Sequence, residues 1–250
     1  MRLMRTTLTT AAACLVAATA AAQSAAPPPF IMATYYRCDY VKQTKADTLY
    51  KKVMVPALEN QIKAGHLTAY GFSSHRIGGE YRRLETMTAP TLAHLIAAQE
   101  GVIAELDKTN PKGAAEFDAI CGTHTDYIWQ RVLGSTPDPK APTPAFSYSR
   151  YLVCDMAKEN EADLIMATSL AAMMNKHVAA GHITGWGWFT HNMGGANRRI
   201  LNWSAPDVMS ALNAEEMISN DIAADPMGPA FTAICNSHSD YLWHSEVASR

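Results

Sequence analysis

The chain has 250 residues, of which 48% are hydrophobic and 18% charged, so it is long and apolar enough to fold as one or two globular domains. This composition excludes a disordered, collagen-like or coiled-coil protein. Its 21 basic and 23 acidic residues give a formal net charge of −2, which does not favour binding to nucleic acid or to an anionic membrane surface.

The first residues have the pattern of a secretory signal peptide. Arg2 and Arg5 precede an uncharged run, and the small residues 20–22 fit a cleavage site before Gln23. We predict that residues 1–22 are removed and that the protein is exported, either to the periplasm or outside the cell. The alternatives are a retained anchor or a lipidated Cys14, but the run is mostly Ala and Thr. After removal we expect no membrane insertion, because no later run is long and apolar enough.

The rest of the chain contains an internal duplication. A shift of 116 places residues 35–88 over residues 151–204 without a gap, and 16 of the 54 positions are identical. A shift of 114 places residues 117–129 over residues 231–243 with 8 of 13 identical. A period of this length matches one small domain per copy. We therefore predict a disordered segment at 23–32, repeats at 33–132 and 148–250, and a proline-rich linker at 133–147.

The elements of each copy follow in the same order. We predict strands at 35–42 and 151–157, then helices at 46–64 and 162–180 that end at a glycine. Hairpins follow, with strands at 66–75 and 82–87 around Gly78-Gly79 in the first copy. Second helices open at the predicted N-caps Thr88 and Ser204, each followed by a proline, Pro90 or Pro206, in the first turn. Short helical pieces and last strands, at 117–121 and 124–132 in the first copy, complete the order β-α-β-β-α-β.

That order is the ferredoxin-like unit, an α+β fold in which the last strand lies antiparallel beside the first. The end of strand one then approaches the start of strand four. We therefore predict the disulfides Cys38–Cys121 and Cys154–Cys235, each closing a loop of about 80 residues. The alternative is four free buried thiols.

The second face of each sheet needs a partner, and the other copy supplies one. With its helix ending at Gly65, its strand at 67–72 and its Gly78-Gly79 turn, the chain resembles the dimeric α/β-barrel superfamily. The resemblance implies two ferredoxin-like units forming an intramolecular barrel, and a monomer with pseudo-dimeric halves. That group includes cofactor-independent monooxygenases, isomerase-like, haem-binding and NIPSNAP-type proteins. It has no shared catalytic motif, so no residue role is carried over, and a cysteine-tethered helix before strand four is not general in it.

Aromatic residues share one face of the second strand in each copy, by the two-residue period of a strand. We place this face in the cavity between the sheets, where the rings would bind a flat apolar ligand. The alternative is that the same stripe is only the core between the sheets. The predicted ligand-binding residues here are His66, Tyr70, Phe72, His182, Trp186 and Trp188.

The last strands carry a histidine and an aspartate two residues apart. His124 and Asp126, and equally His238 and Asp240, share a strand face, so imidazole and carboxylate can meet. Aspartate would fix the tautomer and raise the basicity of histidine, as a general base needs. We predict these four residues as catalytic, with Asp39 and Asp155 near the same clusters in the two copies. The alternative is a structural hydrogen-bond network beside the disulfide.

Paired arginines start the third strand of each copy, at Arg82-Arg83 and Arg198-Arg199. One of each pair could point into the cavity and bind a carboxylate or an oxyanion, whereas surface exposure is the ordinary alternative. His75 and His191 would cap the hairpin or line a cavity mouth. The sequence has no metal, P-loop, dinucleotide or nucleophile-elbow motif, so we predict no metal and no cofactor.

Together these features predict an exported barrel protein that binds a small apolar or aromatic molecule. The candidate reactions are isomerisation, lyase action or cofactor-independent oxidation through the His and Asp groups. The alternatives are a non-catalytic carrier or sensor, and a haem-binding barrel that uses His66 and His182 or His75 and His191.

Overall fold

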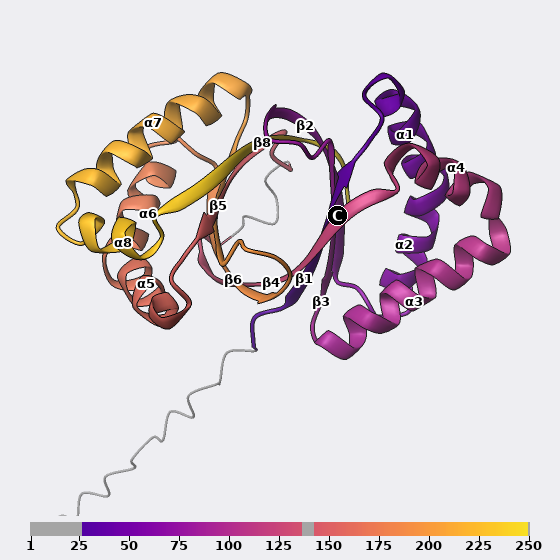
Figure 1. The fold of residues 1–250 in the computed structure, drawn as a ribbon, viewed down its shortest axis with the longest axis horizontal. Coiled ribbons are helices and arrows are strands. Elements are labelled where there is room, and N and C mark those ends of the chain that lie inside the picture. The colour runs from indigo at the N-terminus through magenta and orange to yellow at the C-terminus, as the bar shows by residue number, and fades with distance from the viewer. Residues whose placement is uncertain (1–26, 137–142, 250) are drawn as a thin grey trace, which may run out of the picture.

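A computed structural model describes residues 27–136 and 143–249 (Figure 1). The predicted signal peptide at 1–22 lies outside the described residues. In the described part, no helix is both long and apolar enough to cross a membrane.

Each half contains four strands and an outer layer of helices. The first half consists of β1 (Phe30–Arg37), a 3₁₀ turn (Tyr40–Lys42), α1 (Gln43–Leu49), a π-helical turn (Tyr50–Met54), α2 (Val55–Lys63), β2 (Ala69–Gly78), β3 (Arg83–Ala89), α3 (Leu92–Thr109), α4 (Pro111–Cys121) and β4 (Thr123–Gly134). The second half consists of β5 (Phe146–Val153), a 3₁₀ turn (Met156–Lys158), α5 (Glu159–Ile165), a π-helical turn (Met166–Leu170), α6 (Ala171–Ala179), β6 (Gly185–Met193), β7 (Arg199–Ala205), α7 (Val208–Ala224), α8 (Gly228–Ile234) and β8 (Ser237–Ala248).

The eight strands form one closed antiparallel barrel in the order β1-β3-β2-β8-β5-β7-β6-β4. The two halves meet edge to edge, where β2 pairs with β8 and β4 pairs with β6. The helices of each half cover the outside of its own strands, so the barrel lies between two helical layers (Figure 1). The predicted α+β class is confirmed, and closure into a barrel leaves neither sheet with a free edge.

The strand boundaries differ from the predicted domain limits. β1 begins at Phe30, inside the segment predicted to be disordered, because residues 30–32 pair with β3 and β4. β4 continues to Gly134 and β5 begins at Phe146, so the strands take both ends of the predicted linker. Residues 137–142 of that linker lie outside the described residues.

The long helices start three residues later than predicted. Thr88 and Ser204 belong to strands β3 and β7. The helix caps are instead Thr91, whose hydroxyl accepts the His94 amide hydrogen, and Asp207, whose carboxylate accepts that of Ser210. The proline therefore ends the strand and precedes the cap.

Both predicted disulfides are present and tie strand one to the end of the short helix in each half. Cys38 bonds to Cys121 and Cys154 bonds to Cys235, across 83 and 81 residues of sequence. The prediction succeeded because the antiparallel pairing of the first and last strands brings these ends together.

Three hydrophobic cores hold the molecule together. One core lies between the strands and helices of the first half, and a second lies in the same place in the second half. The third fills the inside of the barrel. The barrel core is aromatic: its buried rings come from β1, β4, β5 and β8, and they are Tyr35, Tyr127, Trp129, Tyr151, Tyr241 and Trp243. The predicted ring-lined hollow between the sheets is therefore wrong, since rings from these four strands pack against each other there.

Candidate functional site

The rings of the second strand face the helices and not the barrel interior. Phe72 stacks on Tyr50 from the helical layer, with ring centroids 3.7 Å apart. The Tyr70 hydroxyl donates to Glu59, and the indole nitrogens of Trp186 and Trp188 donate to Asn175 and Asp163 on the covering helices; the donor–acceptor distances are 2.6, 2.9 and 2.8 Å. The predicted placement of these four rings in an inter-sheet cavity is therefore wrong.

The small residues of the same strand explain this orientation. Gly71 and Gly187 face the crowded barrel interior, where an added methyl on Gly187 would lie 2.8 Å from the Phe189 ring. The interior already holds the rings of four other strands, and Phe189 and Arg131 occupy the space beside Gly187. The large rings consequently point outward and pack beneath the helices.

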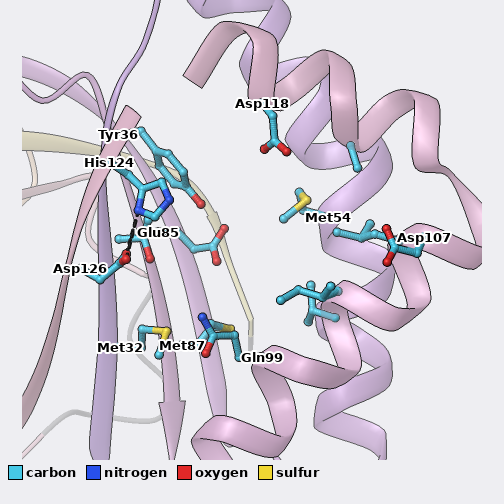
Figure 2. A pocket seen from close by; sticks show the side chains of 15 residues that line it. Met32, Tyr36, Met54, Glu85, Met87, Gln99, Asp107, Asp118, His124 and Asp126 are labelled. Atoms are coloured by element: carbon cyan, nitrogen blue, oxygen red, sulfur yellow. Dashed lines mark hydrogen bonds and ion pairs between the residues drawn. The ribbon is translucent and has the colours of Figure 1, made fainter. Parts of the chain in front are cut away.

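A cavity of about 310 Å³ lies on this helix-facing side of the first half (Figure 2). Strands β1, β3 and β4 form one wall, and the π-helical turn, α3 and α4 form the other. The lining mixes apolar side chains with four acidic groups, Glu85 and Asp126 on the strand wall and Asp107 and Asp118 on the helix wall. It consists of Met32, Thr34, Tyr36, Met54, Glu85, Met87, Gln99, Val102, Ile103, Leu106, Asp107, Ala114, Asp118, His124 and Asp126.

Register places three polar residues in one row across this wall. Thr34 on β1 pairs with Glu85 on β3 and with Asp126 on β4. Residues paired across antiparallel strands present their side chains on the same face. Glu85 and Asp126 therefore lie on either side of the small Thr34 side chain, and Figure 2 shows both acidic groups on the strand side of the cavity.

Glu85 is the unusual group in this row. It is only 5% exposed, and its Oε2 is buried without a hydrogen-bond partner among the described residues. Burial raises the pKa of Glu85 from its ordinary 4.5 to about 7; the Tyr50 hydroxyl opposes the shift and the charge of Asp126 adds to it. The Tyr50 hydroxyl is also buried without a partner, and burial raises its pKa well above its ordinary value. Glu85 can therefore exchange a proton near neutral pH.

The predicted contact of His124 with Asp126 is confirmed. His124 Nδ1 lies 3.1 Å from Asp126 Oδ2, and both side chains are nearly half exposed at the edge of the cavity. The Tyr36 ring packs against the imidazole, with centroids 5.7 Å apart. Asp39 does not join this cluster, because it caps the following turn through the Val41 amide and pairs with Lys42.

The second half has the same scaffold with different occupants. His238 Nδ1 lies 2.9 Å from Asp240 Oδ2, so the second predicted pair also forms. The row across the strands now reads Leu201, Arg150 and Asp240, since Arg150 pairs with both neighbours. Asp155 caps its own 3₁₀ turn through the Ala157 amide and stays outside the pair.

Arg150 fills much of the space that is open in the first half. Its Nη2 donates to Glu215 at 2.6 Å and to Ser219 at 2.9 Å, and its Nε donates to Asp240 at 3.4 Å. Its guanidinium carbon also lies 5.9 Å from the centroid of the Trp203 ring. The remaining cavity is about 150 Å³ and contains no buried glutamate. The two halves therefore offer different sites.

The paired arginines mostly hold the helices onto the strands. Arg83 Nη2 donates to Asp47 at 2.7 Å, and Arg199 Nε donates to Asp163 at 2.7 Å, both from buried positions. Arg198 pairs with Glu159. These contacts lie on the helix side. The prediction that one arginine of each pair points into the cavity between the sheets is therefore wrong for these three arginines.

Arg82 and the remaining histidines also lie away from the cavity. Arg82 Nη1 donates to His75 Nδ1 at 2.8 Å beside the barrel core. Burial and the nearby Arg82 charge lower the pKa of His75, and burial and Arg198 lower that of His191. His66 Nδ1 is 2.9 Å from Gln61, and His182 Nδ1 is 3.0 Å from His177 Nδ1.

None of the four histidines predicted as alternative haem ligands lines the cavity. His75 and His191 pack between core rings, and His66 and His182 contact the covering helices. Neither pair therefore offers an axial ligand to that space. Among residues 27–136 and 143–249, no group of three or more His, Cys, Asp or Glu side chains is arranged to hold a metal ion.

Sequence reasoning did not select Glu85, Tyr50 or Tyr36. The one signal for Glu85 was its position in the repeat. It is a charged residue within the third strand, and the corresponding residue of the second copy is the apolar Leu201. In a repeat that otherwise keeps its pattern, such a difference marks a position where the two copies have diverged.

Comparison with known proteins identifies the fold. No known protein family and no curated protein sequence matches the chain. A proposed monooxygenase from Fusobacterium nucleatum has a TM-score of 0.60 at 9% identity, covering 90% of this chain and 95% of that one. A proposed monooxygenase from Lactobacillus acidophilus has a TM-score of 0.57 at 10% identity, covering 89% and 96%. An anthrone oxidase-like protein has a TM-score of 0.56 at 9% identity, covering 89% and 93%.

These neighbours are dimeric α/β-barrel proteins, and the resemblance predicted from the sequence layout is confirmed. At such low identity the similarity concerns the fold.

Proposed function

We propose that this chain is an exported protein of two tandem ferredoxin-like units whose first half is a proton-transfer enzyme for a small apolar or aromatic substrate. The observation that carries the proposal is Glu85, a buried carboxyl with a pKa of about 7 in the wall of a cavity that it shares with methionine and other apolar side chains. A group that is half protonated near neutral pH can both accept and return a proton.

The surroundings of Glu85 suit such a substrate. Met32, Met54 and Met87 supply flexible apolar surface that adapts to the shape of a ring system. The substrate proton would pass to the carboxylate of Glu85, which lines the cavity. His124, oriented by Asp126, would exchange the proton with solvent at the cavity edge.

The reaction class is proton removal from an acidic C–H or O–H group, which leads to isomerisation, elimination or cofactor-independent oxidation. For oxidation, the carbanion would react with O₂. With anthrone as the example, anthrone and O₂ would give anthraquinone and water, so the step balances without a bound cofactor. The anthrone oxidase-like fold neighbour makes anthrone the first probe to try. We also propose that the chain acts as a monomer, because its own two halves complete the barrel.

The test measures anthrone consumption, O₂ uptake and anthraquinone formation, after subtraction of spontaneous oxidation. Glu85→Gln should lower kcat/KM at least 100-fold with little change in fold, because the amide cannot accept the proton. Thr34→Arg should abolish turnover, since it places in the first cavity the arginine that fills the second one.

The duplicated chain supplies a matched control for the histidine. His124→Ala should slow turnover, whereas His238→Ala changes the equivalent pair in the half with the smaller cavity and no buried glutamate, and should leave turnover unchanged. Equal effects of the two substitutions would contradict the proposal. Retention of anthrone without product, with equal affinity in the Glu85→Gln variant, would identify a carrier instead.

A further inference from the structure

A second cavity is separate from the proposed active site. It has a volume of about 660 Å³ and lies where β4 of the first half meets β6 of the second, at one end of the barrel. Its walls include Phe189, Pro144 and Pro206, with Asn202 and Ser204 as polar groups. No residue lines both this cavity and the Glu85 cavity.

Arg131 on β4 is the charged residue in this wall. Its Nη2 donates to the carbonyl oxygens of Ser135 and Trp186, at 2.7 and 2.8 Å. These two bonds hold the guanidinium in place against the backbone. Among residues 27–136 and 143–249, its Nε and Nη1 have no hydrogen-bond acceptor and its charge has no carboxylate partner.

Two glycines make room for this arrangement. An added methyl on Gly134, where φ is +151°, would lie 2.2 Å from Arg131 Nη2, and one on Gly187 would lie 2.9 Å from Arg131 Nε. Any side chain at these positions would displace the guanidinium. The backbone on both sides is therefore shaped around the arginine.

The lack of a carboxylate partner distinguishes Arg131 from the buried arginines of the molecule. Arg83, Arg150 and Arg199 each pair with an aspartate or glutamate. Burial lowers the pKa of Arg131, which reflects the cost of holding this cation without a counter-charge. An anionic ligand would remove that cost.

The other junction between the halves has no equivalent cation. Arg131 pairs with Phe189 across β4 and β6, and the matching pair across β2 and β8 is Ser245 with Ser73. The repeat therefore does not require an arginine here. The cation belongs to one junction only, as expected for a single binding site.

We propose that this cavity binds a small organic anion, a carboxylate attached to an apolar ring or chain. The carboxylate would accept hydrogen bonds from the free Nη1 of Arg131, while Nη2 stays bonded to the two carbonyl oxygens. The apolar body would lie along Phe189 and the two prolines. The site is built from both halves and is independent of the chemistry proposed at Glu85.

The test compares 2-naphthoate with the neutral 2-naphthamide by isothermal titration calorimetry on the full chain. The wild type should bind naphthoate at least tenfold more tightly than the amide. Arg131→Met should remove this preference and leave amide binding unchanged, and Arg131→Lys should keep part of it. Ser245→Met at the other junction is the matched control and should change neither affinity.

Three outcomes would overturn the proposal: equal affinity of the wild type for both probes, unchanged naphthoate binding in Arg131→Met, or its loss in Thr34→Arg. If Arg131→Met does not fold, Ser204→Phe narrows the cavity without touching the arginine and should prevent naphthoate binding; retained binding would refute the site. Anthrone turnover should be unchanged in Arg131→Lys, so failure here and failure of the proposed enzyme function can be told apart.

Discussion

Replacing Glu85 with glutamine should change how the stability of the protein depends on pH. The pKa of Glu85 is about 7 in the fold and 4.5 when unperturbed, and a shift of this size corresponds to about 3 kcal/mol at roughly 1.4 kcal/mol per pH unit. Because the folded protein holds the proton more tightly, the stabilisation is fully present below about pH 4.5. It is lost as the pH rises through about 7.

Glutamine does not titrate. The unfolding free energy of Glu85→Gln minus that of the wild type should therefore increase by about 3 kcal/mol between pH 4 and pH 8. Urea denaturation of both proteins at intervals of one pH unit measures this difference, and groups common to both cancel. Glu85→Leu, which copies Leu201 of the second half, is a control that also lacks the titrating group and should follow the same trend. A difference that stays constant across this range would show that Glu85 titrates normally.

Four further variants test an ion-pair network, a disulfide and the packing at two glycines. Arg150→Met should lower the unfolding free energy by about 2 kcal/mol in urea titrations, because it leaves two carboxylates, 31% and 29% exposed, without their cation. Replacing both Cys38 and Cys121 with alanine opens an 83-residue separation and should cost about 4.5 kcal/mol in the chain-entropy account; a loss below about 1 kcal/mol would contradict it. Gly187→Ala should cost about 1–3 kcal/mol, and Gly71→Ala less, since only a threonine hydroxyl at 3.0 Å must move; the reverse order of melting temperatures would refute the packing argument.

The sequence was sufficient for the features that depend on topology. The repeat and the predicted strand order placed Cys38 beside Cys121, and the two-residue period of a strand placed His124 beside Asp126. Both conclusions need only the path of the backbone. The structure agrees because pairing of the first and last strands fixes these neighbours.

It was harder to predict which face of a strand points into the barrel, because the strands pack on rings on one face and on helices on the other. Tyr70 and Phe72 alternate with Ala69 and Gly71, and this pattern is compatible with rings inside the barrel or beneath the helices. The decision is made by distant strands, whose rings, such as Trp129 and Trp243, fill the interior. Glu85 was missed for a related reason, since its burial depends on helices that are far away in the sequence.

Fusing the two copies into one polypeptide has an evolutionary consequence. In a barrel built from two identical chains, every substitution appears twice, so a residue that opens one site opens the other as well. Here Thr34 and Arg150 occupy corresponding positions in a single gene product and can mutate separately. The two copies can thus diverge, and an open cavity in one half does not require an open cavity in the other.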